Sequence, residues 1–314
     1  MSKRRANKKE EQQYLNILED ILSEGYKKPC ASGNEEHDTY SLHGVKMEYS
    51  LMSNGKRILP LLTSKRVSFR LVLSELLWFL SGSTSAKELV EKYNNHIWDA
   101  NADEDGELGP IYGHQWRSWN APFEEYDEQS QSQSSEISIS VSEESECEYI
   151  DQIETAIAGL KADIESKTFS RRHVVSAWNP EQLEEMVLPP CHVLFHFLLR
   201  PDRDSGSPIL DCLLYQRSGD FPLGVPFNIA SYSLLTHMIS QIINATPGKF
   251  IHFIGDAHIY QNQIPGCKMQ LEKSIGRFPV LNMKRRINID DFVFDDFEIS
   301  GYKHAGTIDF PLNV

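Results

Sequence analysis

One segment limits the fold of this chain more than any other. Residues 70–81, "RLVLSELLWFLS", are apolar on nearly every side and end before Gly82. A helix that is apolar all round needs cover from other parts of the protein, so the sequence predicts a buried helix here. Glu75 is the exception within it. A carboxylate among leucines is costly unless it is paired or protonated, so Glu75 either faces solvent or has a functional role.

The remaining elements alternate between helices and strands. Apolar spacing predicts helices at 10–24, 149–164 and 226–244. Segments rich in Val, Ile, Leu and Phe predict strands at 172–178, 192–200, 209–217 and 249–255. A chain of 314 residues with 40% hydrophobic content is long enough for a sizeable core. The alternation predicts a mixed α/β (α+β) fold.

The stretch 124–148, "EEYDEQSQSQSSEISISVSEESECE", is a low-complexity run of Ser, Glu and Gln. Its few apolar residues cannot offset the entropy of ordering it, so we expect a disordered loop inserted in a folded domain. Residues 121–150 carry nine acidic residues and no Lys or Arg, and without them the net charge of −14 becomes −5. This balance disfavours general nucleic-acid binding.

The N-terminal residues and the cysteines indicate the class of protein. Residues 1–9 hold five Lys or Arg and no apolar run, so we expect a disordered basic tail, with a weak nuclear address as the alternative. No apolar stretch approaches the ~20 residues of a membrane span. The five cysteines form no CxxC pair and no metal spacing with histidine. We therefore expect a cytoplasmic protein with reduced thiols and without a metal.

Polar residues gather in four segments that each adjoin a strand. Cys191 follows two prolines and directly precedes the strand at 192–200. The other segments contribute Arg171 and Arg172; Arg217, Ser218, Asp220, Gly224 and Asn228; and Asp256, His258 and Tyr260. Paired arginines, and a Gly-containing loop that enters a helix, are typical of sites for anions such as phosphate. A free cysteine is more often structural than reactive, so these residues alone leave the role of Cys191 open.

These segments resemble the thymidylate synthase family. The matching motifs are "SELLWFLSG", "IWDAN", "LGPIYGHQWR", "SRRHVVSAWN", "LPPCH", "YQRSGDFPLGVPFNIASY" and "GDAHIY", in family order. The resemblance implies a bent mixed sheet flanked by helices, and a homodimer packed sheet against sheet. It also implies a single catalytic domain at 10–314, because motifs on both sides of the acidic insert form one site.

The reaction that the resemblance implies is the reductive methylation of dUMP to dTMP. The co-substrate 5,10-methylenetetrahydrofolate supplies both the carbon and the hydride, and no metal is needed. Cys191 is implied as the nucleophile, Glu75 as a proton relay, and Tyr112 and Asp256 as parts of the surrounding hydrogen-bond network. Asn228 is implied as the uracil reader, because a carboxamide can both donate and accept.

The resemblance also assigns the other contacts of the two ligands. The implied phosphate contacts are Arg217 and Ser218 together with Arg171 and Arg172 of the partner subunit, and the implied sugar contacts are His258 and Tyr260. Asp220 is implied as a contact of both the nucleotide and the folate. The implied folate contacts are Ile97, Trp98, Asp220, Leu223, Gly224, Phe227 and Val314. Two expectations rest on general chemistry. Arg217 should lower the pKa of the Cys191 thiol, and His192 should point away from Cys191 along the strand.

Three positions depart from the family pattern. The interval 31–41, "ASGNEEHDTYS", lacks the Arg-Thr-Gly-Thr loop and so one phosphate-binding arginine. Asn101 replaces a frequent tryptophan, and Gln263 stands where a histidine is usual. These departures bear on efficiency more than on the class of reaction.

Two alternatives remain beside the methyltransferase. In a dUMP hydroxymethylase of the same fold, water captures the methylene adduct in place of hydride; Asn228 disfavours a cytosine substrate, because cytosine-specific relatives carry aspartate there. In a non-catalytic nucleotide-binding protein, the acidic insert would be a docking segment. The joint presence of Cys191, Glu75 and Asn228 favours the enzyme.

Overall fold

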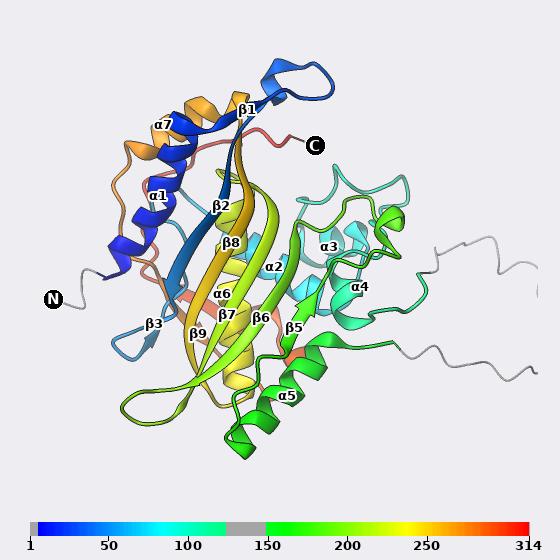
Figure 1. The fold of residues 1–314 in the computed structure, drawn as a ribbon, viewed down its shortest axis with the longest axis vertical. Helices are drawn as coiled ribbons and strands as arrows, with labels where there is room; N and C mark the ends of the chain where they lie inside the picture. The colour runs from blue at the N-terminus through cyan, green and yellow to red at the C-terminus, as the bar shows by residue number, and fades with distance from the viewer. Residues whose placement is uncertain (1–5, 124–148, 314) are drawn as a thin grey trace, which may run out of the picture.

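The computed structural model describes residues 6–123 and 149–313 of the chain. A six-stranded sheet forms its centre, in the order β1-β2-β8-β7-β6-β5 (Figure 1). Strands β7 and β8 are parallel, and the other neighbours are antiparallel. The predicted mixed α/β fold is therefore confirmed.

The elements have the following bounds. The helices are α1 Ala6–Glu24, α2 Phe69–Leu80, α3 Ala86–Tyr93, α4 Tyr112–Arg117, α5 Gln152–Ser166, α6 Gly224–Ile242 and α7 Ile264–Leu271. The strands of the large sheet are β1 Tyr26–Lys28, β2 Thr39–Ser50, β5 His173–Ser176, β6 His192–Pro201, β7 Pro208–Asp220 and β8 Thr246–Tyr260. Two small hairpins pair β3 Met52–Ser53 with β4 Lys56–Arg57, and β9 Val280–Met283 with β10 Phe297–Ser300.

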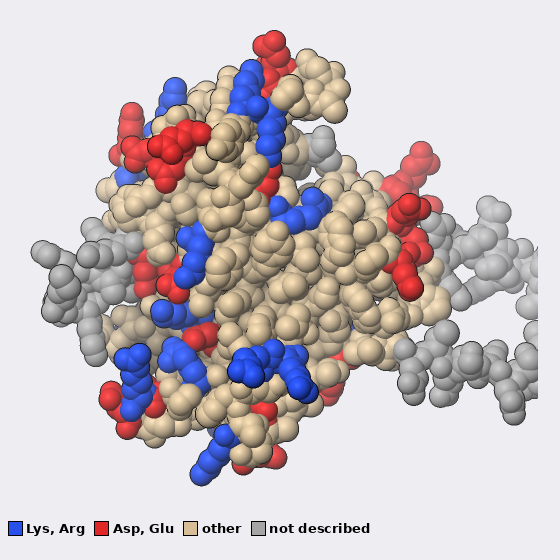
Figure 2. All heavy atoms as spheres, viewed as in Figure 1, with Lys and Arg blue, Asp and Glu red and all other residues tan. Residues whose placement is uncertain are grey.

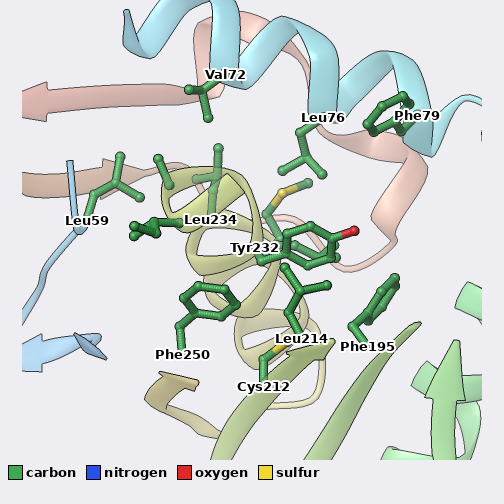
Figure 3. Packing of buried hydrophobic residues seen from close by; sticks show 14 of the residues in the cluster. Leu59, Val72, Leu76, Phe79, Phe195, Cys212, Leu214, Tyr232, Leu234 and Phe250 are labelled. Carbon is green, nitrogen blue, oxygen red and sulfur yellow. The ribbon is translucent and has the colours of Figure 1, made fainter. Parts of the chain in front are cut away.

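The core lies on one face of the sheet, around α6. Figure 3 shows α6 between the strands and α2, with Leu214 and Phe250 on the sheet side and Val72 and Leu76 on the α2 side. Every residue of α2 from Val72 to Leu80 is buried, and the Ser68 side chain caps the helix by accepting from the Leu71 N–H. The prediction of a buried helix at 70–81 is confirmed, with Glu75 inside it.

One long strand, β2, was not predicted from the sequence. β2 pairs with β8 over almost its whole length, but its residues alternate poorly between apolar and polar, and Gly44 interrupts it with φ +74°. One face of β2 packs against α1, so only a few of its side chains are buried, among them Met47 and Tyr49. A strand whose burial comes from a distant helix carries a weak local signal.

The N-terminal boundary also differs from the expectation. α1 begins at Ala6, so residues 6–9 belong to a helix and not to the expected basic tail at 1–9; residues 1–5 lie outside the described residues. Within α1, the Tyr14 ring stacks on Phe221 with centroids 4.7 Å apart, and its hydroxyl donates to the Phe221 carbonyl at 3.1 Å. This contact supports the loop between β7 and α6.

The acidic stretch 124–148 lies outside the described residues, but both of its flanks are described. Trp119 and Ile150 form an antiparallel bridge, with N–H to carbonyl distances of 3.0 Å in both directions. The chain therefore leaves and returns at one place, between α4 and α5, which contact each other.

Candidate functional site

Cys191 lies at the start of β6, in a loop that Arg217 of β7 holds in place. The Arg217 guanidinium donates from Nε to the Pro190 carbonyl at 3.0 Å and from Nη2 to the Pro189 carbonyl at 2.7 Å. The Arg217 backbone N–H donates to the Cys191 carbonyl at 2.8 Å. The same guanidinium lies over the Trp178 ring, with Arg217 Cζ 5.7 Å from the ring centroid. A cation and a half-buried thiol are thus fixed side by side.

Two opposing effects set the pKa of the thiol. Burial raises the pKa of Cys191 above its ordinary value, and the opposing effects of Arg217 and the Tyr112 hydroxyl do not cancel it. The expectation that Arg217 lowers the pKa of the thiol is confirmed, but desolvation of a thiolate outweighs one neighbouring cation here. Arg217 still makes the pKa lower than burial alone would leave it.

Glu75 points from α2 toward the same region. Its side chain is 8% exposed, and Oε1 accepts from the Trp98 indole N–H at 2.9 Å. Burial raises the pKa of Glu75 to about 7, although the bond from Trp98 lowers it. Tyr112, the first residue of α4, packs against Trp98, and its hydroxyl accepts from the Cys191 backbone N–H at 2.8 Å. The aromatic side chains of Trp98 and Tyr112 thus lie between the carboxyl of Glu75 and the loop of Cys191.

His192 also packs within this group. Its ring lies 5.0 Å from the Tyr112 ring, centroid to centroid, and the side chain of the buried Asn228 of α6 is near enough to act on its pKa. Burial lowers the pKa of His192 to about 4, so the ring is neutral at pH 7. That His192 points away from Cys191 stays a prediction; the register of β6 on β7 shifts only after His192, between it and Leu194.

The residues expected to contact phosphate and sugar lie on adjacent strands. In the register of β7 and β8, Ser218 is opposite Asp256, and Asp220 is opposite His258. The His258 and Tyr260 rings meet edge to face with centroids 5.3 Å apart. Neighbouring strands lie about 4.8 Å apart. These side chains therefore form one compact polar row.

A lysine that the sequence reasoning missed adjoins this row. Lys28 of β1 donates to the Asp256 carboxylate, whose other oxygen lies 3.5 Å from His258 Nδ1. Burial opposes ionisation of Asp256, but the neighbouring His258, Lys28 and Ser41 side chains outweigh it and hold its pKa well below the usual range. Lys28 is 228 residues from Asp256 in the chain, so no local pattern signals the pair.

The expected folate contacts lie along the entrance to α6 and beside Glu75. Leu223 caps α6, Gly224 is its first residue, and Phe227 is partly buried against the core. Asp220 ends β7, and its carboxylate accepts from the Leu223 N–H at 3.1 Å and from Gln263 Nε2 at 2.9 Å. Ile97 and Trp98 are also partly buried. Val314 lies outside the described residues.

Arg171 and Arg172 do not lie with the other predicted site residues. Both are exposed and directly precede β5, on the edge of the sheet. The next residue, His173, is opposite Phe197 of β6, six residues beyond Cys191. At about 3.3 Å per residue this is a separation of ~20 Å. The two arginines therefore cannot reach the Cys191 of their own chain.

Other classes of site have little support in the described part of the chain. Within residues 6–123 and 149–313, no group of three His, Cys, Asp or Glu side chains is placed to hold a metal ion. None of the helices described there is long and apolar enough to span a bilayer. Cys30, Cys191, Cys212 and Cys267 carry free thiols, and Cys147 falls in the stretch not described.

The chain is similar to known proteins over most of its length. Residues 12–314 match the family model for thymidylate synthase. The chain is 42% identical to a bifunctional dihydrofolate reductase-thymidylate synthase from Zea mays, covering 97% of this chain and 55% of that protein. It is 39% identical to a probable thymidylate synthase from Schizosaccharomyces pombe, covering 97% of this chain and 48% of that protein. The chain thus spans about half the length of these curated relatives.

Proposed function

This chain belongs to the thymidylate synthase family, and we propose that it catalyses the reductive methylation of dUMP to dTMP. The co-substrate is 5,10-methylenetetrahydrofolate, and the second product is dihydrofolate. The observation that carries the proposal is the meeting of Cys191, Arg217 and Tyr112 with the buried Glu75 and Asn228. A nucleophile, a cation, a titratable acid and a carboxamide then surround one site.

In the proposed reaction, the Cys191 thiol loses its proton and the thiolate adds to ring carbon six of dUMP. Ring carbon five becomes nucleophilic and attacks the methylene carbon of the folate. Ring carbon five then loses its proton, and the bond between the methylene carbon and the tetrahydrofolate breaks. The methylene group stays on ring carbon five. Hydride from the tetrahydrofolate reduces this group to methyl, and the thiolate departs from carbon six. The atoms and electrons balance without a metal or a nicotinamide.

Glu75 is proposed as the group that relays protons to and from the pyrimidine ring. A carboxyl with a pKa of about 7 is partly protonated at neutral pH, so it can serve both as acid and as base. Asn228 is proposed to read the uracil edge, with neutral His192 holding its carboxamide in one orientation. Tyr112 is proposed to hold the loop of Cys191 beside the pyrimidine ring, through the hydrogen bond that its hydroxyl accepts from the Cys191 N–H.

The proposed phosphate contacts require two subunits. Arg217 and Ser218 come from one chain, and Arg171 and Arg172 of the partner subunit complete the set. The sheet face opposite α6 supports a homodimer: it exposes Tyr215 at 44%, Phe253 at 38% and Val174 at 41%. Figure 2 shows few charged side chains over the middle of β6 and β7. An apolar patch of this kind is typical of a protein interface. We propose the cytoplasm as the location of the dimer.

The test uses purified protein with dUMP and methylenetetrahydrofolate. Formation of dihydrofolate and dTMP in equal amounts is the expected result. A hydroxymethyl nucleotide without dihydrofolate would instead identify the hydroxymethylase, and absence of turnover at saturating substrate would indicate a binding protein. Cys191→Ser is the matched control. It should bind dUMP within about threefold of wild type and lose turnover by at least ~10³-fold, because a hydroxyl is a far weaker nucleophile at neutral pH.

A further inference from the structure

Gln263 has every hydrogen-bonding group of its side chain engaged. It is the last residue of the single 3-10 turn Gln261–Gln263 that follows β8, and it is 1% exposed. Its Nε2 donates to Asp220 Oδ2 at 2.9 Å and to the Pro311 carbonyl at 3.1 Å. Its Oε1 accepts from the Tyr260 backbone N–H at 3.1 Å. Both N–H donors of the carboxamide thus bind an acceptor, and its oxygen accepts from one donor.

The Pro311 carbonyl belongs to a C-terminal segment that is seated on α7. The Phe310 ring fills the space at Gly266, where an added Cβ would come within 2.6 Å of it, and Lys65 Nζ lies 4.7 Å from its centroid. Asn313 Oδ1 accepts from Asn262 at 2.8 Å. Figure 1 shows this segment passing α7 near the end of β8. Gln263 is the described residue that joins the segment directly to Asp220.

We propose that Gln263 is a positioning residue that couples the C-terminal segment to Asp220, so that the two form one wall of the folate site. The proposal rests on the proposed function, because Asp220 matters there as a folate contact. A neutral imidazole has one donor and one acceptor, so a histidine cannot serve all three partners. A carboxylate has no donor at all. Of these three side chains, only the carboxamide holds Asp220, Pro311 and Tyr260 together.

Gln263→Glu is the decisive variant, because Glu keeps the acceptor for Tyr260 and loses both donors. Gln241→Glu is the matched control: Gln241 on α6 also donates to a backbone carbonyl, that of Lys284, at 3.0 Å. The first readout is the rate at which a carboxypeptidase releases the C-terminal residues, which needs no turnover. The second readout compares the KM for methylenetetrahydrofolate with the dissociation constant of dUMP.

In Gln263→Glu we expect C-terminal release to be about three- to tenfold faster, as the loss of the hydrogen bond to the neutral Pro311 carbonyl predicts. The folate KM should rise by a similar factor, and dUMP affinity should stay within about twofold of wild type. Gln241→Glu should match wild type in all three measurements. A selective folate KM change separates positioning from general loosening, which would affect both ligands.

Release at the wild-type rate in Gln263→Glu would overturn the proposal, and so would equal acceleration in both variants. If Gln263→Glu does not fold, Gln263→Met, which is similar in length and uncharged, is measured in its place with the same expectations for release and folate KM. Failure of the proposed function would appear separately, as absence of wild-type turnover. The release assay would still decide whether Gln263 holds the C-terminal segment.

Discussion

At the scale of single residues, the burial of Glu75 makes the stability of the fold depend on pH. Its folded pKa of about 7 lies above the ordinary value of 4.5 for this carboxyl group, so its stabilising contribution is present below pH 4.5 and is lost as pH rises through 7. Ionising it at pH 8 costs on the order of 3 kcal/mol. We expect Glu75→Gln to have a higher free energy of unfolding than wild type at pH 8, and to lose the excess near pH 5.

The measurement for Glu75→Gln is denaturant unfolding at both pH values, combined with turnover. Gln keeps an oxygen that can accept from the Trp98 indole N–H, so packing should be preserved. Turnover should fall by ~10²–10⁴-fold, as for a lost general acid–base group. A stability difference that does not change with pH would contradict the raised pKa.

Lys28 is the second residue with a measurable consequence. The interval 31–41 contains no arginine, and Lys28 places a cation on Asp256, directly opposite Ser218. We expect Lys28→Met to weaken dUMP binding by about threefold while deoxyuridine binding stays unchanged, since a partly exposed charge is screened by water. Isothermal titration with both ligands measures the ratio.

Lys27→Met is the control for Lys28→Met. Lys27 is the adjacent residue of β1, but its ammonium group binds Asp38 at 3.0 Å instead of Asp256. It should leave the dUMP to deoxyuridine ratio at the wild-type value. The effect of Lys28→Met should also shrink at high salt. Equal ratios in both variants would mean that Lys28 does not contact the phosphate.

At the scale of elements, the segment between α4 and α5 is where we expect a deletion to be tolerated best. The bridge between Trp119 and Ile150 brings its two flanks together. We expect that deleting 124–148 and inserting a short Gly-Ser linker leaves dimerisation unchanged and turnover within about twofold, because closure entropy changes by only about 0.6 kcal/mol per doubling of loop length. Size-exclusion chromatography and the turnover assay measure this. Aggregation would show that the segment contributes to packing.

The elements also show what a sequence can predict. α2 and α6 were found because their own apolar residues bury them, and the prolines, glycines and polar residues around Cys191 marked the loops of the site. β2 was missed because its burial depends on α1, and the packing of His192 on Tyr112 was missed because it joins distant segments. The pairs Lys28–Asp256 and Gln263–Pro311 join distant segments, so only the folded chain reveals them.

At the scale of the whole molecule, the ~20 Å between Cys191 and the start of β5 predicts a site shared by two subunits. Cys191→Ser alone should be inactive, and a chain with Arg171→Ala and Arg172→Ala should be weakly active. When equal amounts are unfolded together and refolded, half of the dimers are mixed. Each mixed dimer then has one site with an intact Cys191 facing intact arginines, so about a quarter of wild-type activity should return.

Refolding each variant alone is the control. If the mixture shows only the average activity of the two variants, then Arg171 and Arg172 do not act across the interface.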